Sequence, residues 1–230
     1  MAFVSTPPSL VISYLTLRKV VGILGMALPF LLLLGWWLWE RNCHFPPSIS
    51  HFYYSVVGDV FVGTLCAVSL FLFSYNGYDA NDRYAAKAAG LFALLVAFFP
   101  TNFGSFAAES CSRLVRTNNN LANAIHYGAA LLFFGTLTYF CLFLFTKTSQ
   151  HGPVQGNKKI RNNIYKICGW VMVVCMLLLL GVTLLPNGYY HAIRHLKPVY
   201  ILETIALLAF GYSWLIKGDT FFRDVAPPRF

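Results

Sequence analysis

Six long stretches of this chain of 230 residues hold almost no charged residue, and each can cross a bilayer as a helix. A helix needs about 20 apolar residues to span about 30 Å of hydrocarbon. Helices satisfy their own backbone polar groups, which find no water there. We therefore predict an all-α, polytopic membrane protein, with one helical-bundle domain over residues 1–230. The predicted spans are Val20–Trp39, Val60–Tyr78, Ala88–Ala108, Leu121–Thr146, Ile167–Tyr190 and Pro198–Ile216.

The composition supports a lipid environment. Hydrophobic residues make up 57% of the chain and charged residues only 11%, with a mean hydropathy of +0.61. A soluble domain carries about 25% charged residues. This chain therefore lacks the polar residues that would cover a water-soluble core, and its expected partners are membrane lipids.

The net charge of +9 does not indicate nucleic-acid binding, because the basic residues lie in short segments between the apolar stretches. A nucleic-acid surface needs a basic stripe on a folded domain. Twelve Lys and Arg residues fall on one predicted side of the membrane and five on the other. Basic residues favour the cytoplasmic side, so this difference predicts that both termini are cytoplasmic.

The same topology gathers ionisable side chains on the outer side. Five of the six histidines and three acids fall in outer loops or at outer helix ends. They are His44, His51, His126, His191, His195, Asp59, Glu109 and Glu203. This one-sided grouping predicts a polar site between the helices that is open to the outside.

Two of these acids are candidate proton acceptors. Glu203 lies about five residues into an otherwise uncharged span, where a carboxylate is costly unless it faces the bundle interior or a partner. The alternative is a structural hydrogen bond to another helix. Asp59 begins the second span and could serve as the acceptor, or could favour the positive end of its helix.

His191 and His195 are spaced to face the same side of a helix, which suits two ligands of a zinc ion. His126 and His51 are the candidate further ligands. Arg194 and Lys197 flank the pair and could instead hold the phosphate of a lipid headgroup.

Two structural expectations follow from small residues and cysteines. Ala85, Ala89, Ala93 and Ala97 recur once per helical turn, so they predict a ridge that lets another helix approach closely. Cys43 and Cys111 both fall on the predicted outer side, where an oxidising compartment would permit a disulfide between them.

Several blocks of the sequence resemble a family of small multi-pass bacterial membrane proteins. They are Pro47–Ser50, Asp59–Gly63, Phe98–Thr101 and Ala209–Gly218. This resemblance covers most of the chain and implies an inner-membrane location, with no activity attached. The chain is also similar to the membrane hydrolases that include alkaline ceramidases and adiponectin-type receptors. That similarity implies a zinc site of His191, His195 and His51, with Asp59 and Ser48 or Ser50 nearby.

Two functions are consistent with this sequence. The first is a metal-dependent hydrolase of a lipid or amphiphile, in which zinc activates water and Asp59 or Glu203 accepts the proton. The second is a non-catalytic protein that binds lipid or a small molecule, or a transporter or assembly factor. In the second case Glu203 and Asp59 would pack or gate the bundle.

Overall fold

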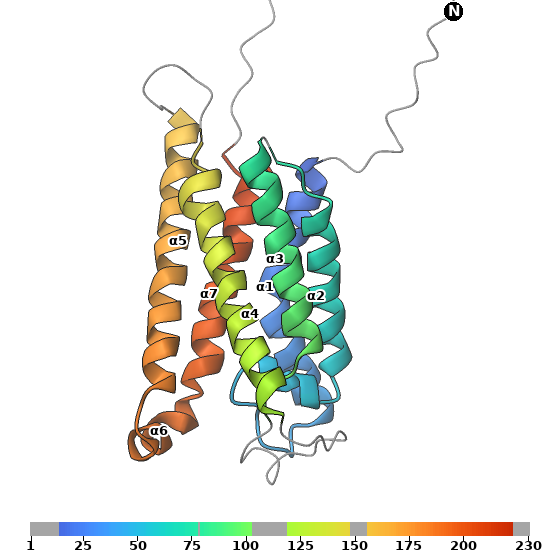
Figure 1. Cartoon of the computed structure of the whole chain (residues 1–230), viewed down its shortest axis with the longest axis vertical. Coiled ribbons are helices and arrows are strands. Elements are labelled where there is room, and N and C mark those ends of the chain that lie inside the picture. Colours follow the sequence, from blue (N-terminus) through green and yellow to red (C-terminus); the bar gives the residue numbers. More distant parts are fainter. Residues whose placement is uncertain (1–13, 78, 103–118, 148–155, 223–230) are drawn as a thin grey trace, which may run out of the picture.

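The computed structural model describes residues 14–77, 79–102, 119–147 and 156–222. The described chain is all-α (Figure 1). Its elements are α1 (Tyr14–Trp39), η2 (Ser50–Tyr54), α2 (Gly58–Phe73), α3 (Ala80–Phe98), α4 (Asn120–Tyr139), the π-helical η4 (Phe140–Leu144), α5 (Gly156–Thr183), α6 (Asn187–Ile193), η5 (Arg194–Leu196) and α7 (Pro198–Lys217).

Four of these helices are long and apolar enough to cross a membrane, so the prediction of six spans is wrong. The four stretches are Leu15–Trp39, Asn120–Leu144, Gly156–Thr183 and Pro198–Lys217. The predicted span Val60–Tyr78 corresponds to α2, which has 16 residues and therefore covers only about 24 Å. The predicted span Ala88–Ala108 overlaps α3, which ends at Phe98.

The errors at these two helices have local causes. Gly77 has a φ of +63°, a backbone conformation that favours glycine and ends regular helix. The chain therefore turns just after α2, within the predicted span. The first half of α3 carries Asp82, Arg83 and Lys87, so its apolar part is short. The last residues of that predicted span lie outside the described part.

The long helices lie side by side, and the start of α1 and the end of α7 are at the same end of the bundle (Figure 1). α7 packs against both α1 and α5, and α3 packs between α2 and α4. The short helix α6 connects α5 to α7 at the opposite end (Figure 1). We call this the η2 end, because η2 also lies there, and call the other the terminal end.

Small residues set the closest helix contacts. A Cβ built on Gly22 of α1 would lie 2.7 Å from the carbonyl oxygen of Gly211 in α7. Only glycine permits that approach. Ala89, Ala93 and Ala97 are fully buried and Ala85 partly buried, so the predicted ridge on α3 is confirmed as a packing surface.

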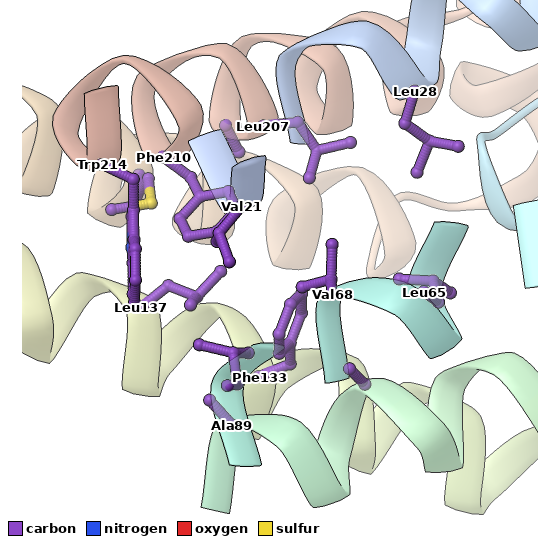
Figure 2. Packing of buried hydrophobic residues seen from close by; sticks show 14 of the residues in the cluster. Val21, Leu28, Leu65, Val68, Ala89, Phe133, Leu137, Leu207, Phe210 and Trp214 are labelled. Carbon is purple, nitrogen blue, oxygen red and sulfur yellow. The ribbon is translucent and has the colours of Figure 1, made fainter. Parts of the chain in front are cut away.

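Apolar side chains point both inward and outward. Figure 2 shows the interior, where Val21, Val68, Phe133 and Leu207 from four helices meet. The outer face of α5 exposes Trp170 and Leu177, which are 60% and 63% accessible. A helix that is apolar all round belongs in a protein core or a membrane. The exposed apolar faces of the four long helices therefore fit contact with lipid.

Candidate functional site

The segment between α1 and α2 brings polar groups to the η2 end of the bundle. Ser48 Oγ lies 2.6 Å from His51 Nδ1, and the backbone N–H of His51 donates to the same hydroxyl at 3.3 Å. Ser48 is buried, whereas Ser50 and His51 keep part of their surface accessible. Pro46 and Pro47 precede these residues and restrict the backbone, which helps to hold this polar segment against the helices.

Glu203, in α7, is tied to this segment. The backbone N–H of Ile49 donates to Glu203 Oε2 at 2.6 Å. Glu203 is partly buried, and this bond matches the alternative of a structural hydrogen bond to another part of the chain. Its role as a proton acceptor stays a prediction. One bond does not use the full accepting capacity of a carboxylate, which has about four lone-pair sites.

His126, in α4, connects three parts of the chain. It is 1% accessible, with Nδ1 2.7 Å from the carbonyl oxygen of Phe99 and Nε2 2.9 Å from Ser50 Oγ. A carbonyl oxygen only accepts hydrogen bonds, so Nδ1 carries the proton. In the neutral imidazole Nε2 is then an acceptor, and the Ser50 hydroxyl donates to it.

A cavity of about 50 Å³ lies beside these groups. It is lined by Leu28, Ile49, Ser50, Phe61, Leu65, Val96, Ala130, Phe133, Phe134, Glu203 and Leu207. Figure 2 labels Leu28, Leu65, Phe133 and Leu207, which reach it from four different helices. This volume holds a few water molecules or a small chemical group. Ser50 and Glu203 are its polar side chains, so the cavity combines an apolar wall with one polar end.

His51 is neutral at physiological pH. Burial, together with the nearby His126 and Lys197, lowers its pKa to about 4. Desolvation and neighbouring positive charge both disfavour the imidazolium ion. The Ser48–His51 pair therefore contains an uncharged imidazole, as a hydrogen-bonding or proton-accepting group requires.

The remaining predicted site residues lie apart from this cavity. His191 is on α6 and His195 on η5, both exposed. α6 ends at Ile193, so the pair does not share one continuous α-helix. Asp59, in the first turn of α2, is exposed and does not line the cavity. Glu109 lies outside the described residues.

The predicted zinc site and headgroup site remain predictions. Among the residues that the structure describes, no three His, Cys, Asp or Glu side chains group in a way that could hold a metal ion. His51 and His126 are instead hydrogen-bonded to serines. Arg194 is exposed, while Lys197 Nζ donates to the carbonyl oxygen of Phe45 at 2.7 Å.

Ser50 and the backbone N–H of Ile49 are site groups that residue-type patterns do not single out. Ser50 is 76 positions from His126 in the sequence, and Ile49 is 154 positions from Glu203. Serine alone carries no periodic or charge signal in a membrane sequence. The resemblance to membrane hydrolases implies that Ser48 or Ser50 lies near a zinc ion. It does not imply a hydrogen bond between Ser50 and His126.

Cysteine pairing adds information about the η2 end. Cys43, just after α1, is disulfide-bonded, whereas Cys66, Cys141, Cys168 and Cys175 are free. Its predicted partner Cys111 lies outside the described residues. A disulfide at this end is typical of an oxidising compartment.

The terminal end carries a second buried polar cluster of different character. Arg18 in α1 donates to the carbonyl oxygen of Lys217 and to the hydroxyl of Tyr75, both at 3.2 Å. Lys217 Nζ donates to the carbonyl oxygen of Phe145 at 3.3 Å and lies 5.3 Å from the ring centre of Phe145. These cations therefore bind groups at the ends of neighbouring helices.

Two carboxylates meet one ammonium at the same end. Lys147 Nζ lies 2.6 Å from Asp79 Oδ2 and 3.0 Å from Asp82 Oδ1. The hydrogen bond from Lys147, supported by the backbone N–H of Asp82, lowers the pKa of the Asp79 carboxyl. Asp79 also caps α3 through that N–H, at 3.0 Å. The cluster thus joins α3 to the segment after α4.

Comparison with family models, curated proteins and solved structures finds no match for this chain. Neither resemblance found in the sequence is therefore supported by these comparisons. What the chain shows is an all-α architecture with four helices that could span a membrane.

Proposed function

We propose that this chain is an integral membrane protein that binds a small amphiphilic molecule in the cavity beside Glu203. This proposal concerns binding and includes no catalytic step. The observation that carries the proposal is a carboxylate within an apolar helix that accepts one backbone N–H and lines an otherwise apolar cavity. An acid placed there is costly unless it faces a partner or a functional pocket.

The chemistry of the cavity defines the ligand class. A carboxylate accepts hydrogen bonds, so the matching head is a donor, and an ammonium group gains charge attraction as well. The surrounding Leu, Phe and Val side chains suit a short hydrocarbon attached to that head. The small volume admits the head and the first carbons, so a longer tail would extend beyond the cavity.

We further propose that the η2 end faces outward and the terminal end faces the cytoplasm. The disulfide of Cys43 lies at the η2 end, and the buried cations Arg18 and Lys217 lie at the terminal end. Lys158, Lys159 and Arg161 at the start of α5 also lie at the terminal end, and basic residues favour the cytoplasmic side. The inner membrane is the proposed location.

Thermal unfolding of the purified protein in detergent tests ligand binding. Hexylamine, hexanol and hexanoate serve as matched probes, because they share a tail and differ in the head. We expect hexylamine to raise the Tm most and hexanoate to have no specific effect. The increase should disappear in Glu203→Gln and in Ala130→Phe, which fills the cavity.

Glu40→Gln is the matched control. Glu40 also accepts a backbone N–H, from Val56 at 3.0 Å, but this bond is exposed and Glu40 does not line the cavity. The control should retain the full response to hexylamine. Equal responses to all three probes, or a response that survives in Glu203→Gln, would contradict the proposal.

A further inference from the structure

The pair formed by Ser50 and His126 has the geometry of a nucleophile with its base. Ser50 Oγ and His126 Nε2 are 2.9 Å apart, within the reach required for proton transfer. The other ring nitrogen is held at 2.7 Å by the carbonyl oxygen of Phe99. Orientation of the base by a third group is the arrangement that activates a serine.

The direction of the hydrogen bonds matters for this chemistry. The carbonyl oxygen of Phe99 requires a proton on Nδ1, so Nε2 of the neutral ring faces Ser50 with its lone pair. This is the tautomer that accepts the serine proton. The opposite tautomer would set a lone pair against the carbonyl oxygen and would leave a buried acceptor without a donor.

The position of Ser50 links this pair to the cavity. Ser50 lines the cavity together with Glu203, and it keeps part of its surface accessible. A molecule whose head contacts Glu203 would therefore lie next to the Ser50 hydroxyl. Ser48, the other serine bonded to a histidine, is buried and does not line the cavity.

We propose that Ser50 is a nucleophile, with His126 as its general base, toward an ester group of an amphiphile bound in this cavity. This inference deepens the proposed function and depends on it for the ligand class. Ser50 Oγ bonds to the carbonyl carbon while its proton passes to His126 Nε2. The ester C–O bond then breaks, and the alcohol leaves with that proton. Water hydrolyses the acyl-serine to a carboxylic acid and restores the hydroxyl.

A structural role for the same bonds makes a different prediction. Ser50 and His126 join η2 to α4 and to the end of α3, so their loss alone could destabilise the bundle. Hydrogen bonds that only stabilise the fold would not make Ser50 react covalently with an electrophile. The deciding readout is therefore the chemical modification of the unaltered protein.

The experiment uses the full chain in lipid nanodiscs and a fluorophosphonate that carries an alkyl chain. An activated serine forms an O–P bond, the P–F bond breaks, the serine proton passes to His126 and fluoride leaves. We expect one adduct by intact mass, and peptide mapping should place it on Ser50. Its absence, or its location on another serine, would overturn the inference without any variant.

Variants sharpen the assignment. Ser50→Ala should abolish the adduct, and His126→Gln should slow its formation about a hundredfold or more, with folding checked by size-exclusion chromatography and circular dichroism. Ser48→Ala is the matched control and should react at the rate of the unaltered protein. An unchanged rate in a folded His126→Gln protein would contradict the role of His126.

The two proposals fail separately. If hexylamine raises the Tm through Glu203 but Ser50 does not react, only the nucleophile inference is wrong. If Ser50 reacts while the hexylamine effect is absent, the proposed ligand class is wrong and the serine chemistry stands.

Discussion

At the terminal end of the bundle the buried polar groups are cations and acids, whereas at the η2 end they are hydroxyls, imidazoles and one carboxylate. Arg18 and Lys217 contact carbonyl oxygens and aromatic rings. Glu203 and Ser50 line a cavity. Both ends are rich in hydrogen bonds, and at the η2 end some of the polar groups lie beside this cavity.

This difference suggests that the polar groups of the terminal end stabilise the bundle and that those of the η2 end bind a ligand. Carbonyl groups at helix C-termini carry partial negative charge and attract cations. The hydrogen bonds of Arg18 and Lys217 to such carbonyl oxygens therefore hold helix ends together. The proposed binding site depends on the cavity beside Glu203, whereas the terminal cluster is expected to contribute to stability.

The largest effect on stability is expected at the terminal end, for Asp82→Ala. Asp82 is 1% accessible and binds Lys147. Its removal takes the compensating negative charge from a group of buried cations, which should cost about 3 kcal/mol of unfolding free energy. Unfolding by denaturing detergent measures this loss. A change within experimental error would remove the structural role of the cluster.

The pH dependence of stability tests the η2 end. The pKa of His51 is lowered to about 4 in the folded protein, so between pH 6.5 and 4 the unfolded chain binds the additional proton. The free energy of unfolding should fall as the pH decreases from 6.5 to 4. Below pH 4, protonation of His51 should cause no further loss. His51 is partly accessible, so we expect a loss of about 2 kcal/mol.

His51→Gln is the comparison for that measurement. It removes the titrating ring, so the slope of stability against pH between 6.5 and 4 should become shallower than in the unaltered protein. Equal slopes would show that His51 is not held neutral by its surroundings.

Replacing one tyrosine at each end compares the contribution of one hydroxyl hydrogen bond to stability. The hydroxyl of Tyr54 donates to the carbonyl oxygen of Thr101 at 2.6 Å, and that of Tyr75 accepts from Arg18 at 3.2 Å. Tyr54→Phe should cost about 1 kcal/mol, and Tyr75→Phe should cost about 2 kcal/mol because its partner is charged. Thermal unfolding measures both, and the reverse order would contradict the comparison.

The smallest effect is expected for Asp79→Asn. This change keeps an N-cap oxygen for α3 but removes the charge that contacts Lys147. The ion pair is exposed, with side chains 35% and 48% accessible, so solvent and salt screen it. The Tm should decrease slightly at low salt and match that of the unaltered protein at high salt. A decrease as large as that of Asp82→Ala would contradict this account.

The sequence predicts the all-α architecture with apolar helices long enough to cross a membrane, because this feature depends on local hydropathy. Helix ends were less predictable. Uncharged residues continue past Phe73 although the backbone turns at Gly77, and α5 begins at Gly156 in a basic segment. Counting apolar residues does not register either feature.

The candidate site was predictable only in part. Glu203, His51 and His126 were expected at one end, and they lie there. The contacts of Ser50 with His126 and of Ile49 with Glu203 arise from tertiary packing, which no sequence period encodes. His191 and His195 have helical spacing, but a 3₁₀ turn follows Ile193, so they lie on two successive elements of different helical geometry.

Solid-state NMR of the protein with carbon-13 in the glutamate carboxyl groups tests whether an amphiphile with an amine head binds next to Glu203. The chain has three glutamates, and Glu203→Gln assigns the Glu203 signal. We expect this signal to shift when hexylamine is added and to stay in place with hexanoate. A spectrum in which only the other two signals move, or none does, would contradict this expectation.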